Sequence, residues 1–144
     1  MPIDQAADNT TRVAEIFAAF GRGDIDHILD RATDDVRFVA HLDARVPWSG
    51  EFVGKAEVAG YFQAMGSAVE ISDHPVFSLT AQDDRVVARG EVSFRVRQTD
   101  RSGSSNWIYL FRLDQGKVSN FEQFNDHGLA QAFSTTLDSA SAAI

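Results

Sequence analysis

Two predicted strands near the end of the chain carry polar side chains on otherwise apolar faces. Tyr109 shares its face with aromatic and aliphatic residues, and its hydroxyl could donate a hydrogen bond to a developing enolate oxygen. On the final strand, Gln123 and Asn125 share a face with Phe121, a placement that suits amides that orient a ligand. Two alternatives stay open: a core tyrosine with its hydroxyl at a cavity edge, and amides exposed near a strand end.

The histidines do not form a metal-binding pattern. They are His27, His41, His74 and His127, and no pair has the HxxxH spacing. His41 lies two residues before Asp43, a pair that could bind a metal or relay a proton, and the relay makes His41 a candidate catalytic residue. The chain has no cysteine, phosphate-binding loop or serine-centred elbow. We therefore predict neither a metal nor a cofactor.

Composition limits the class of protein. The 144 residues suit one domain, and a hydrophobic content of 44% with 11 phenylalanines is typical of a core with a ligand cavity. A net charge of −8 argues against nucleic acid and anionic membranes as partners. The polar segment Met1 to Thr11 lacks the pattern of a signal peptide, and no apolar run approaches the ~20 residues of a membrane span. We expect a cytoplasmic protein that binds a small apolar molecule.

Helical spacing dominates the first half of the chain. The first predicted helix has an apolar stripe at Val13, Ile16, Phe17 and Phe20. Asn9, Thr10 or Thr11 is expected to cap its start, and Gly21 and Gly23 its end. A second short helix should follow Asp24 as its cap. A third should span Lys55 to Met65 after a turn at Pro47 to Gly50.

Alternating patterns dominate the second half. Strands are predicted at Val36 to His41, Val69 to Leu79, Arg85 to Arg97, Asn106 to Leu113 and Lys117 to Asn125. Turns are expected at Asp83-Asp84 and at Gln115-Gly116. A closing helix should run from Asp126 to Phe133, and the Ser/Ala-rich tail from Ser134 to Ile144 should be frayed.

This order of elements predicts an α+β fold. Helices that precede an antiparallel meander pack on one face of its sheet, and strands longer than the usual ~5–6 residues suit a strongly bent sheet. We predict a cone-shaped single domain over residues 1–144, with a core from about 10 to 133. N-terminal helices would pack on a strongly curved, mostly antiparallel mixed sheet that encloses a pocket.

Three motifs resemble one superfamily in the same order. They are Val13 to Asp26 followed by Asp34-Asp35-Val36, Phe52-Val53-Gly54-Lys55 with Tyr61-Phe62, and Phe111 to Val118. Together they resemble the nuclear-transport-factor-2-like superfamily, in the branch of ketosteroid isomerase and the SnoaL-like polyketide cyclases. The resemblance covers roughly Val13 to Phe133 and implies the fold more strongly than a function.

The resemblance also implies which reactions the chain lacks. The carboxylate base of ketosteroid isomerase falls at Ala40, its phenolic donor at Ile16, and its second donor at Tyr109. A methyl group cannot take a proton, so we do not expect that mechanism. The acid–arginine–acid set of limonene epoxide hydrolases falls at Ser93, Glu91 and Gln123, which do not supply it.

The SnoaL-like cyclases fit better through Asp126. The segment Asp126 to Gln131 is similar to the one in which those enzymes place an acid–base aspartate. Desolvation by Trp107 and Phe121 would raise the pKa of Asp126 and make it a better base. The alternative is that Asp126 only caps the closing helix.

Glu91 is a point on which pattern and resemblance disagree. Strand alternation places Glu91 with Arg89 and Arg95 on a solvated or dimer-facing surface. The alignment with the superfamily would turn it inward, which requires a bulge.

These observations support three hypotheses. The first is an enzyme that transfers a proton on a carbonyl-bearing ligand, with Asp126, Tyr109 and His41 as catalytic candidates. The second is a non-catalytic binding or dimerisation domain, and the third is a protein-interaction module. The predicted ligand contacts are Phe17, Phe38, Ala40, Tyr61, Trp107, Phe121, Gln123 and Asn125. The resemblance implies a homodimer formed through the sheet face.

Overall fold

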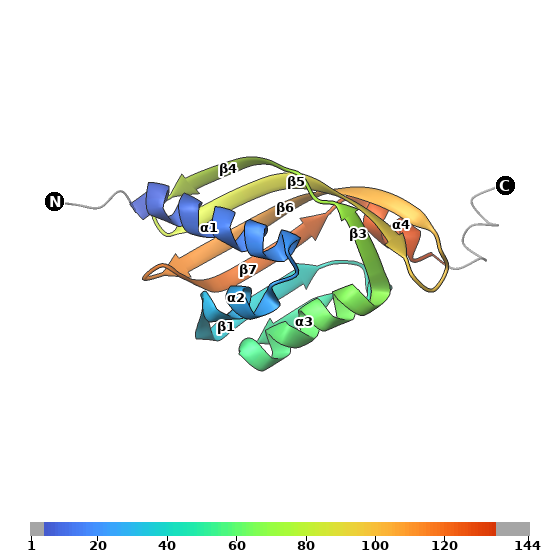
Figure 1. Cartoon of the computed structure of the whole chain (residues 1–144), viewed down its shortest axis with the longest axis horizontal. Helices are drawn as coiled ribbons and strands as arrows, with labels where there is room; N and C mark the ends of the chain where they lie inside the picture. Colours follow the sequence, from blue (N-terminus) through green and yellow to red (C-terminus); the bar gives the residue numbers. More distant parts are fainter. Residues whose placement is uncertain (1–4, 135–144) are drawn as a thin grey trace.

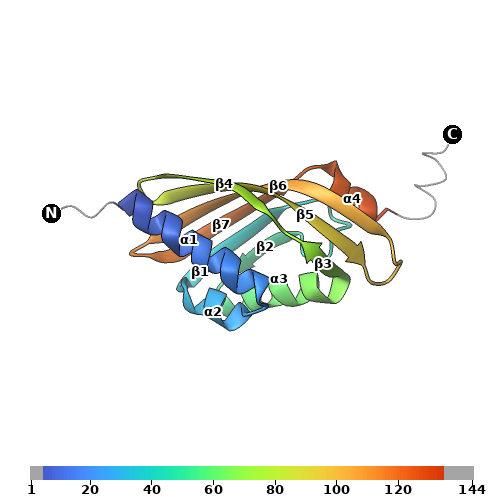
Figure 2. The same ribbon diagram turned by 45° about the horizontal axis from the view of Figure 1, so that its top comes forward.

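One curved mixed sheet wraps around three helices in the computed structural model, which describes residues 5–134 (Figures 1 and 2). Its strands are β1 (Ala32–His41), β2 (Gly50–Val53), β3 (Val69–Asp73), β4 (Val76–Gln82), β5 (Arg85–Val96), β6 (Ser102–Asp114) and β7 (Lys117–Asn125). The helices are α1 (Gln5–Gly21), α2 (Ile25–Asp30), α3 (Lys55–Ala68) and α4 (His127–Ala132). Helices α1, α2 and α3 lie on the concave face, whereas α4 lies at the far end, beside β6. The predicted α+β fold is confirmed.

The sheet order is β2-β1-β7-β6-β5-β3, and β4 also pairs with β5. Strands β1 and β7 are parallel and the other pairs are antiparallel. The register aligns Ala40, Gln123, Tyr109 and Ala88 in one row across β1, β7, β6 and β5. Residues from both halves of the chain therefore meet on one inner face.

Helix α1 begins earlier than predicted. The expected caps at Asn9, Thr10 and Thr11 are wrong, because all three lie inside the helix. Asn9 is buried instead and donates from its amide nitrogen to the Asp83 carbonyl oxygen at 3.1 Å. The end of α1 is as predicted, since Gly23 takes a positive φ of 72° there.

The other predicted elements are present with shifted ends. Asp24 caps α2 by accepting a hydrogen bond from the His27 amide at 3.1 Å, and Gly116 has a positive φ of 83° in the β6–β7 turn. The predicted strand from Val69 to Leu79 is wrong as one element, because it divides into β3 and β4 around His74 and Pro75. Proline has no amide proton to give to a ladder, so the chain bends there.

Alternation along β5 resolves the orientation of Glu91. Gly90 and Val92 are buried on the inner face, while Arg89, Glu91 and Arg95 lie on the outer face. The interpretation from strand alternation is confirmed, and the inward orientation implied by the superfamily alignment is wrong.

The described residues form one core cluster between the helices and the sheet. No helix in this part of the chain is both long and apolar enough to cross a membrane. The tail expected to fray lies, apart from Ser134, outside the described residues.

Candidate active site

An apolar pocket lies between the helices and the inner face of the sheet. This main pocket encloses about 420 Å³, counted with the open space at its mouth. Its lining consists of Ile16, Phe17, Phe20, Ile28, Phe38, Tyr61, Phe62, Met65, His74, Tyr109, Phe111 and Phe121. Such a lining, apolar with a few polar groups, is typical of sites for small molecules.

A second, more polar space adjoins the main pocket. This side pocket measures about 330 Å³, counted with the open space at its mouth, and shares Phe20, Met65, His74 and Tyr109 with the main pocket. Its remaining lining is Trp48, Val69, Ile71, Val92, Phe94, Gln123, Asn125 and Leu129. His74 and Tyr109 therefore lie where the two pockets meet.

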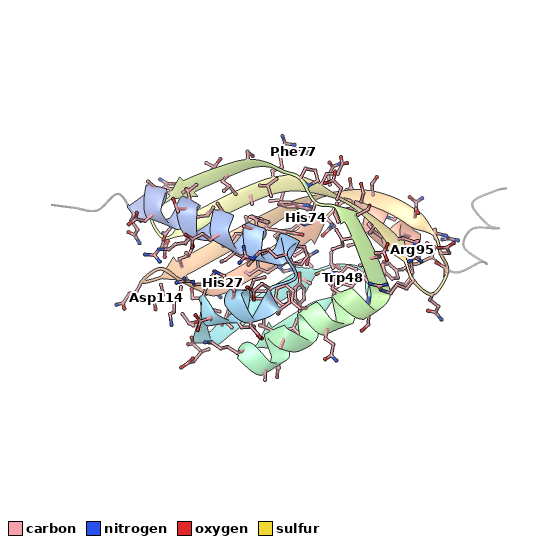
Figure 3. All side chains as sticks on the ribbon, viewed as in Figure 1. His27, Trp48, His74, Phe77, Arg95 and Asp114 are labelled. Carbon is pink, nitrogen blue, oxygen red and sulfur yellow. The ribbon has the colours of Figure 1, made fainter. Side chains whose placement is uncertain are left out.

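His74 and Tyr109 form a hydrogen-bonded pair at this junction. The His74 Nε2 atom lies 3.2 Å from the Tyr109 hydroxyl, and the tautomer of His74 decides which group donates. Figure 3 shows His74 in the interior, between the helices and the sheet. With a base and a phenol in contact beside an apolar space, the base can remove a proton from a bound molecule and the phenol can stabilise the negative charge that results.

Aromatic rings hold His74 in place. Its ring stacks on Trp107 at 4.9 Å between centroids and meets the edge of Phe20 at 5.3 Å. The backbone supports the same position, because the Pro75 carbonyl oxygen accepts a hydrogen bond from the Glu91 amide at 3.1 Å.

Burial sets the protonation state of the pair. Desolvation lowers the pKa of His74 below its ordinary value of 6.5, although its backbone hydrogen bond and Asp73 oppose that shift. Burial also raises the pKa of Tyr109, so its hydroxyl keeps its proton. The pair therefore combines a neutral base with a neutral hydrogen-bond donor at neutral pH.

A chain of hydrogen bonds leads away from the main pocket. The Tyr61 hydroxyl donates to the Gln123 side-chain oxygen at 2.5 Å, and the Gln123 amide nitrogen donates to Asn125 at 2.8 Å. Asn125 donates in turn to the Ser105 hydroxyl at 3.1 Å, which lies 2.9 Å from Asp126. Side chains of both pockets are thus connected to a carboxylate near the surface.

Asp126 has a lower pKa than the sequence suggested. Its carboxylate accepts from the Gly128 amide at 3.1 Å, as a cap of α4, and from Ser105 and both nitrogens of Asn106. Desolvation raises the pKa of Asp126, but these hydrogen bonds together lower it below 3.8. The predicted rise in its pKa is wrong. The capping alternative describes its geometry, and a catalytic role for Asp126 stays a prediction.

His41 lies apart from the pair. It is exposed, its Nε2 atom lies 2.8 Å from Glu122, and its ring stacks on Phe124 at 4.5 Å. Asp43 pairs with Arg45 instead, and hydrogen bonds from Arg45 lower the pKa of Asp43 to about 2. The predicted pairing of His41 with Asp43 is therefore wrong, and within residues 5–134 no cluster of three potential metal ligands occurs.

The structure brings most of the predicted ligand contacts together. Phe17, Phe38, Tyr61 and Phe121 line the main pocket, and Gln123 and Asn125 line the side pocket. Trp107 stacks on Tyr109 at 4.0 Å and supports the pocket wall. Ala40 is buried in the row beside Gln123 but lines neither pocket.

Among the pocket residues that carry polar atoms in their side chains, His74 and Trp48 were missed from the sequence. The signal for His74 was its place before Pro75, because a proline inside an alternating segment ends the strand and redirects the residue before it. Trp48 fell in a predicted turn, where no periodicity marks an inward side chain. Its indole nitrogen is buried and has no hydrogen-bond partner within residues 5–134.

Comparison with known proteins shows the family. Residues 13–121 match the SnoaL-like domain family. A search of curated proteins gave no match. Among solved structures, an NTF2-like protein from Burkholderia xenovorans LB400 is 29% identical, with a TM-score of 0.80, and the match covers 90% of this chain and 98% of that one.

Two further structures share the fold at lower identity. A protein from Xanthomonas campestris, named as a candidate polyketide cyclase, is 19% identical, with a TM-score of 0.72 and coverage of 91% and 100%. TerC, co-crystallised with polyporic acid, is also 19% identical, with a TM-score of 0.74 and coverage of 83% and 92%. The chain therefore belongs to the SnoaL-like family, within the nuclear-transport-factor-2-like superfamily that its sequence resembles.

Proposed function

We propose that this SnoaL-like protein binds a small, apolar, carbonyl-bearing molecule and transfers a proton on it, as an isomerase or cyclase does. The observation that carries the proposal is the contact of 3.2 Å between His74 and Tyr109 at the junction of the two pockets. The name of the Xanthomonas protein and the ligand of TerC agree with this class of molecule, although their likeness to this chain is one of fold.

The reaction begins with His74 as the base. Tyr109 turns its hydroxyl from His74 to the carbonyl oxygen, which frees the Nε2 lone pair. The imidazole then takes a proton from the carbon beside the carbonyl, and the electron pair of that C–H bond forms an enolate. The hydroxyl of Tyr109 stabilises the charge that develops on the oxygen. The imidazolium returns the proton to carbon in an isomerisation. In a cyclisation the enolate carbon attacks a second carbonyl carbon of the ligand, and the imidazolium gives its proton to the alkoxide that forms.

The test is hydrogen–deuterium exchange at carbon, which needs no knowledge of the natural substrate. The probe is 2-indanone in D₂O, and proton NMR follows the loss of its C–H signal above the rate without protein. We expect exchange with the wild type and a loss of at least roughly 100-fold in His74→Gln, as for removal of a general base.

His41→Gln is the matched control, because it makes the same substitution on the outer face. Its rate should equal that of the wild type. If His74→Gln keeps the wild-type rate while Asp126→Asn loses it, then Asp126 is the base and our assignment is wrong.

A second candidate function is ligand binding without chemistry. The observation that favours it is Ala40, a residue that cannot take a proton where the superfamily alignment expects a carboxylate. Binding of 2-indanone by calorimetry, with no exchange above background, would support this function over proton transfer.

We also propose that two copies pair through the outer face of the sheet. The exposed apolar side chains Phe77, Val87, Ile108 and Phe124 lie there on β4, β5, β6 and β7. Figure 3 shows Phe77 pointing outward from β4. An apolar group of this kind favours association.

A further inference from the structure

The hydrogen-bond chain described above ends at a charge. The carboxylate of Asp126 is ionised at neutral pH and can only accept hydrogen bonds. The Ser105 hydroxyl has two acceptors in reach, this carboxylate at 2.9 Å and the Asn106 carbonyl at 3.1 Å. A bond to a charged acceptor is the stronger one, so the proton of Ser105 points to Asp126.

That choice fixes the direction of every other bond in the chain. The oxygen of Ser105 is left to accept, so Asn125 presents its nitrogen to it at 3.1 Å. The oxygen of Asn125 then faces the nitrogen of Gln123 at 2.8 Å, and the oxygen of Gln123 faces the Tyr61 hydroxyl at 2.5 Å. Neither amide can turn over without placing two acceptors or two donors together.

Because the direction of the chain is fixed, one N–H group of each amide side chain remains without an acceptor. Each amide nitrogen has two protons, and the chain uses one of them. The second N–H of Gln123 and of Asn125 has no acceptor among the described residues, and both side chains line the side pocket.

Trp48 adds a third donor to the same lining. It is 3% exposed, and its indole nitrogen has no hydrogen-bond partner among residues 5–134. Figure 3 shows Trp48 in the interior, between α3 and the sheet. A buried donor without an acceptor costs free energy, which a ligand can recover by bringing an acceptor.

We propose that the side pocket is the subsite for the ligand's carbonyl oxygen, held by the N–H groups of Gln123, Asn125 and Trp48. The proposal rests on the proposed function. His74 and Tyr109 line both pockets, and Gln123 lies directly opposite Tyr109 in the sheet. An oxygen bound at this end of the side pocket would therefore lie beside the Tyr109 hydroxyl, with the carbon next to the carbonyl group toward His74. These donors gain strength as charge develops on the oxygen.

The test compares a ketone with a hydrocarbon of the same shape. Calorimetry gives the association constants of 2-indanone and indane, and their ratio measures the contribution of the carbonyl group. We expect this ratio to fall by roughly 3- to 10-fold in Gln123→Met and in Trp48→Phe, the loss of about one hydrogen bond each. Indane binding should change much less.

Gln63→Met is the matched control, since Gln63 is exposed on α3. Its ratio should equal that of the wild type. If both probes bind and neither Gln123→Met nor Trp48→Phe lowers the ratio, the subsite is wrong although the binding pocket stands. If neither probe binds the wild type, the binding pocket itself is wrong, and the proposed function fails with the subsite.

Discussion

His74 is placed to act as a base because its surroundings keep it neutral. Four aromatic rings, those of Phe17, Phe20, Trp107 and Tyr109, have their centroids within 6.0 Å of the centroid of the His74 ring. Desolvation lowers its pKa, so the imidazole carries a free lone pair at neutral pH. The cost is a weaker base, which the buried and protonated Tyr109 offsets by stabilising the product of proton removal.

The side chain of Asp126 contributes to the stability of the fold. Asp126→Asn should lower the free energy of unfolding by about 1 kcal/mol at pH 7, because a neutral acceptor replaces the charged acceptor of the hydrogen bonds from Ser105, Asn106 and Gly128. The folded-state pKa is lowered, so this stabilisation is complete above the ordinary value of 3.8 and is lost as the pH falls through the lowered value. Urea unfolding at several pH values measures the difference.

Asp114→Asn serves as its control, because Asp114 is exposed at the β6–β7 turn and caps no helix. The control should stay within about 0.5 kcal/mol of the wild type. An Asp126→Asn variant as stable as the wild type at pH 7 would contradict a stabilising role of the Asp126 charge.

The candidate site was partly predictable from single residues. Tyr61, Gln123 and Asn125 were found because strand and helix periodicity shows which side chains point inward. The pKa of Asp126 was not predictable, because four hydrogen bonds from Ser105, Asn106 and Gly128 decide it, and these are contacts of the folded chain.

At the scale of elements, β5 and the bend before β4 together position His74. A Cβ atom at Gly90 would lie 2.2 Å from the Trp107 ring and 2.3 Å from the Pro75 carbonyl oxygen. Only glycine allows this close approach. The bend at Pro75 and the Trp107 ring, on which His74 stacks, therefore both lie directly against β5.

Gly90→Ala should therefore lower the free energy of unfolding by about 1–3 kcal/mol, the usual cost of overpacking. It should also reduce proton transfer, since Trp107 and Pro75 must move. Gly60→Ala is the control: it lies inside α3 with open space around its Cβ, and it should be neutral or stabilising by up to about 1 kcal/mol. Equal stability of the two variants by urea unfolding would count against this account.

Elements were more predictable than the breaks between them. The stripes of α1 and α3 and the alternation of β5 follow directly from residue periodicity. The division of β3 from β4 depends on a proline whose effect is visible in the sequence, whereas the early start of α1 depends on Asn9, which is buried by a contact with Asp83 far along the chain.

At the scale of the whole molecule, the curved sheet separates two apolar surfaces. The inner face encloses the pockets, and the outer face carries exposed Ile108 and Phe124, which are paired neighbours on β6 and β7. Alternation in the sequence predicts that the sheet has two faces. How far each face is buried depends on the curvature of the sheet and on any partner chain that covers it.

A homodimer through this outer face should appear in sedimentation velocity at micromolar concentration. Ile108→Lys should shift the protein to a monomer, because it places a charge in the apolar surface. Gln63→Lys is the control, since Gln63 is exposed on helix α3, away from the outer face of the sheet. A wild-type monomer at this concentration would contradict the proposed pairing.

The measurement that tests the central claim most directly is the pH profile of deuterium exchange into 2-indanone, corrected for the rate without protein. Neutral His74 is the reactive form and its pKa is lowered from 6.5. The rate should therefore exceed half of its maximum at pH 6.5 and fall as the pH is lowered further, and His74→Gln should abolish the wild-type profile. A rate that stays constant from pH 6.5 down to pH 4 would instead indicate a carboxylate base, and would contradict the assignment of His74.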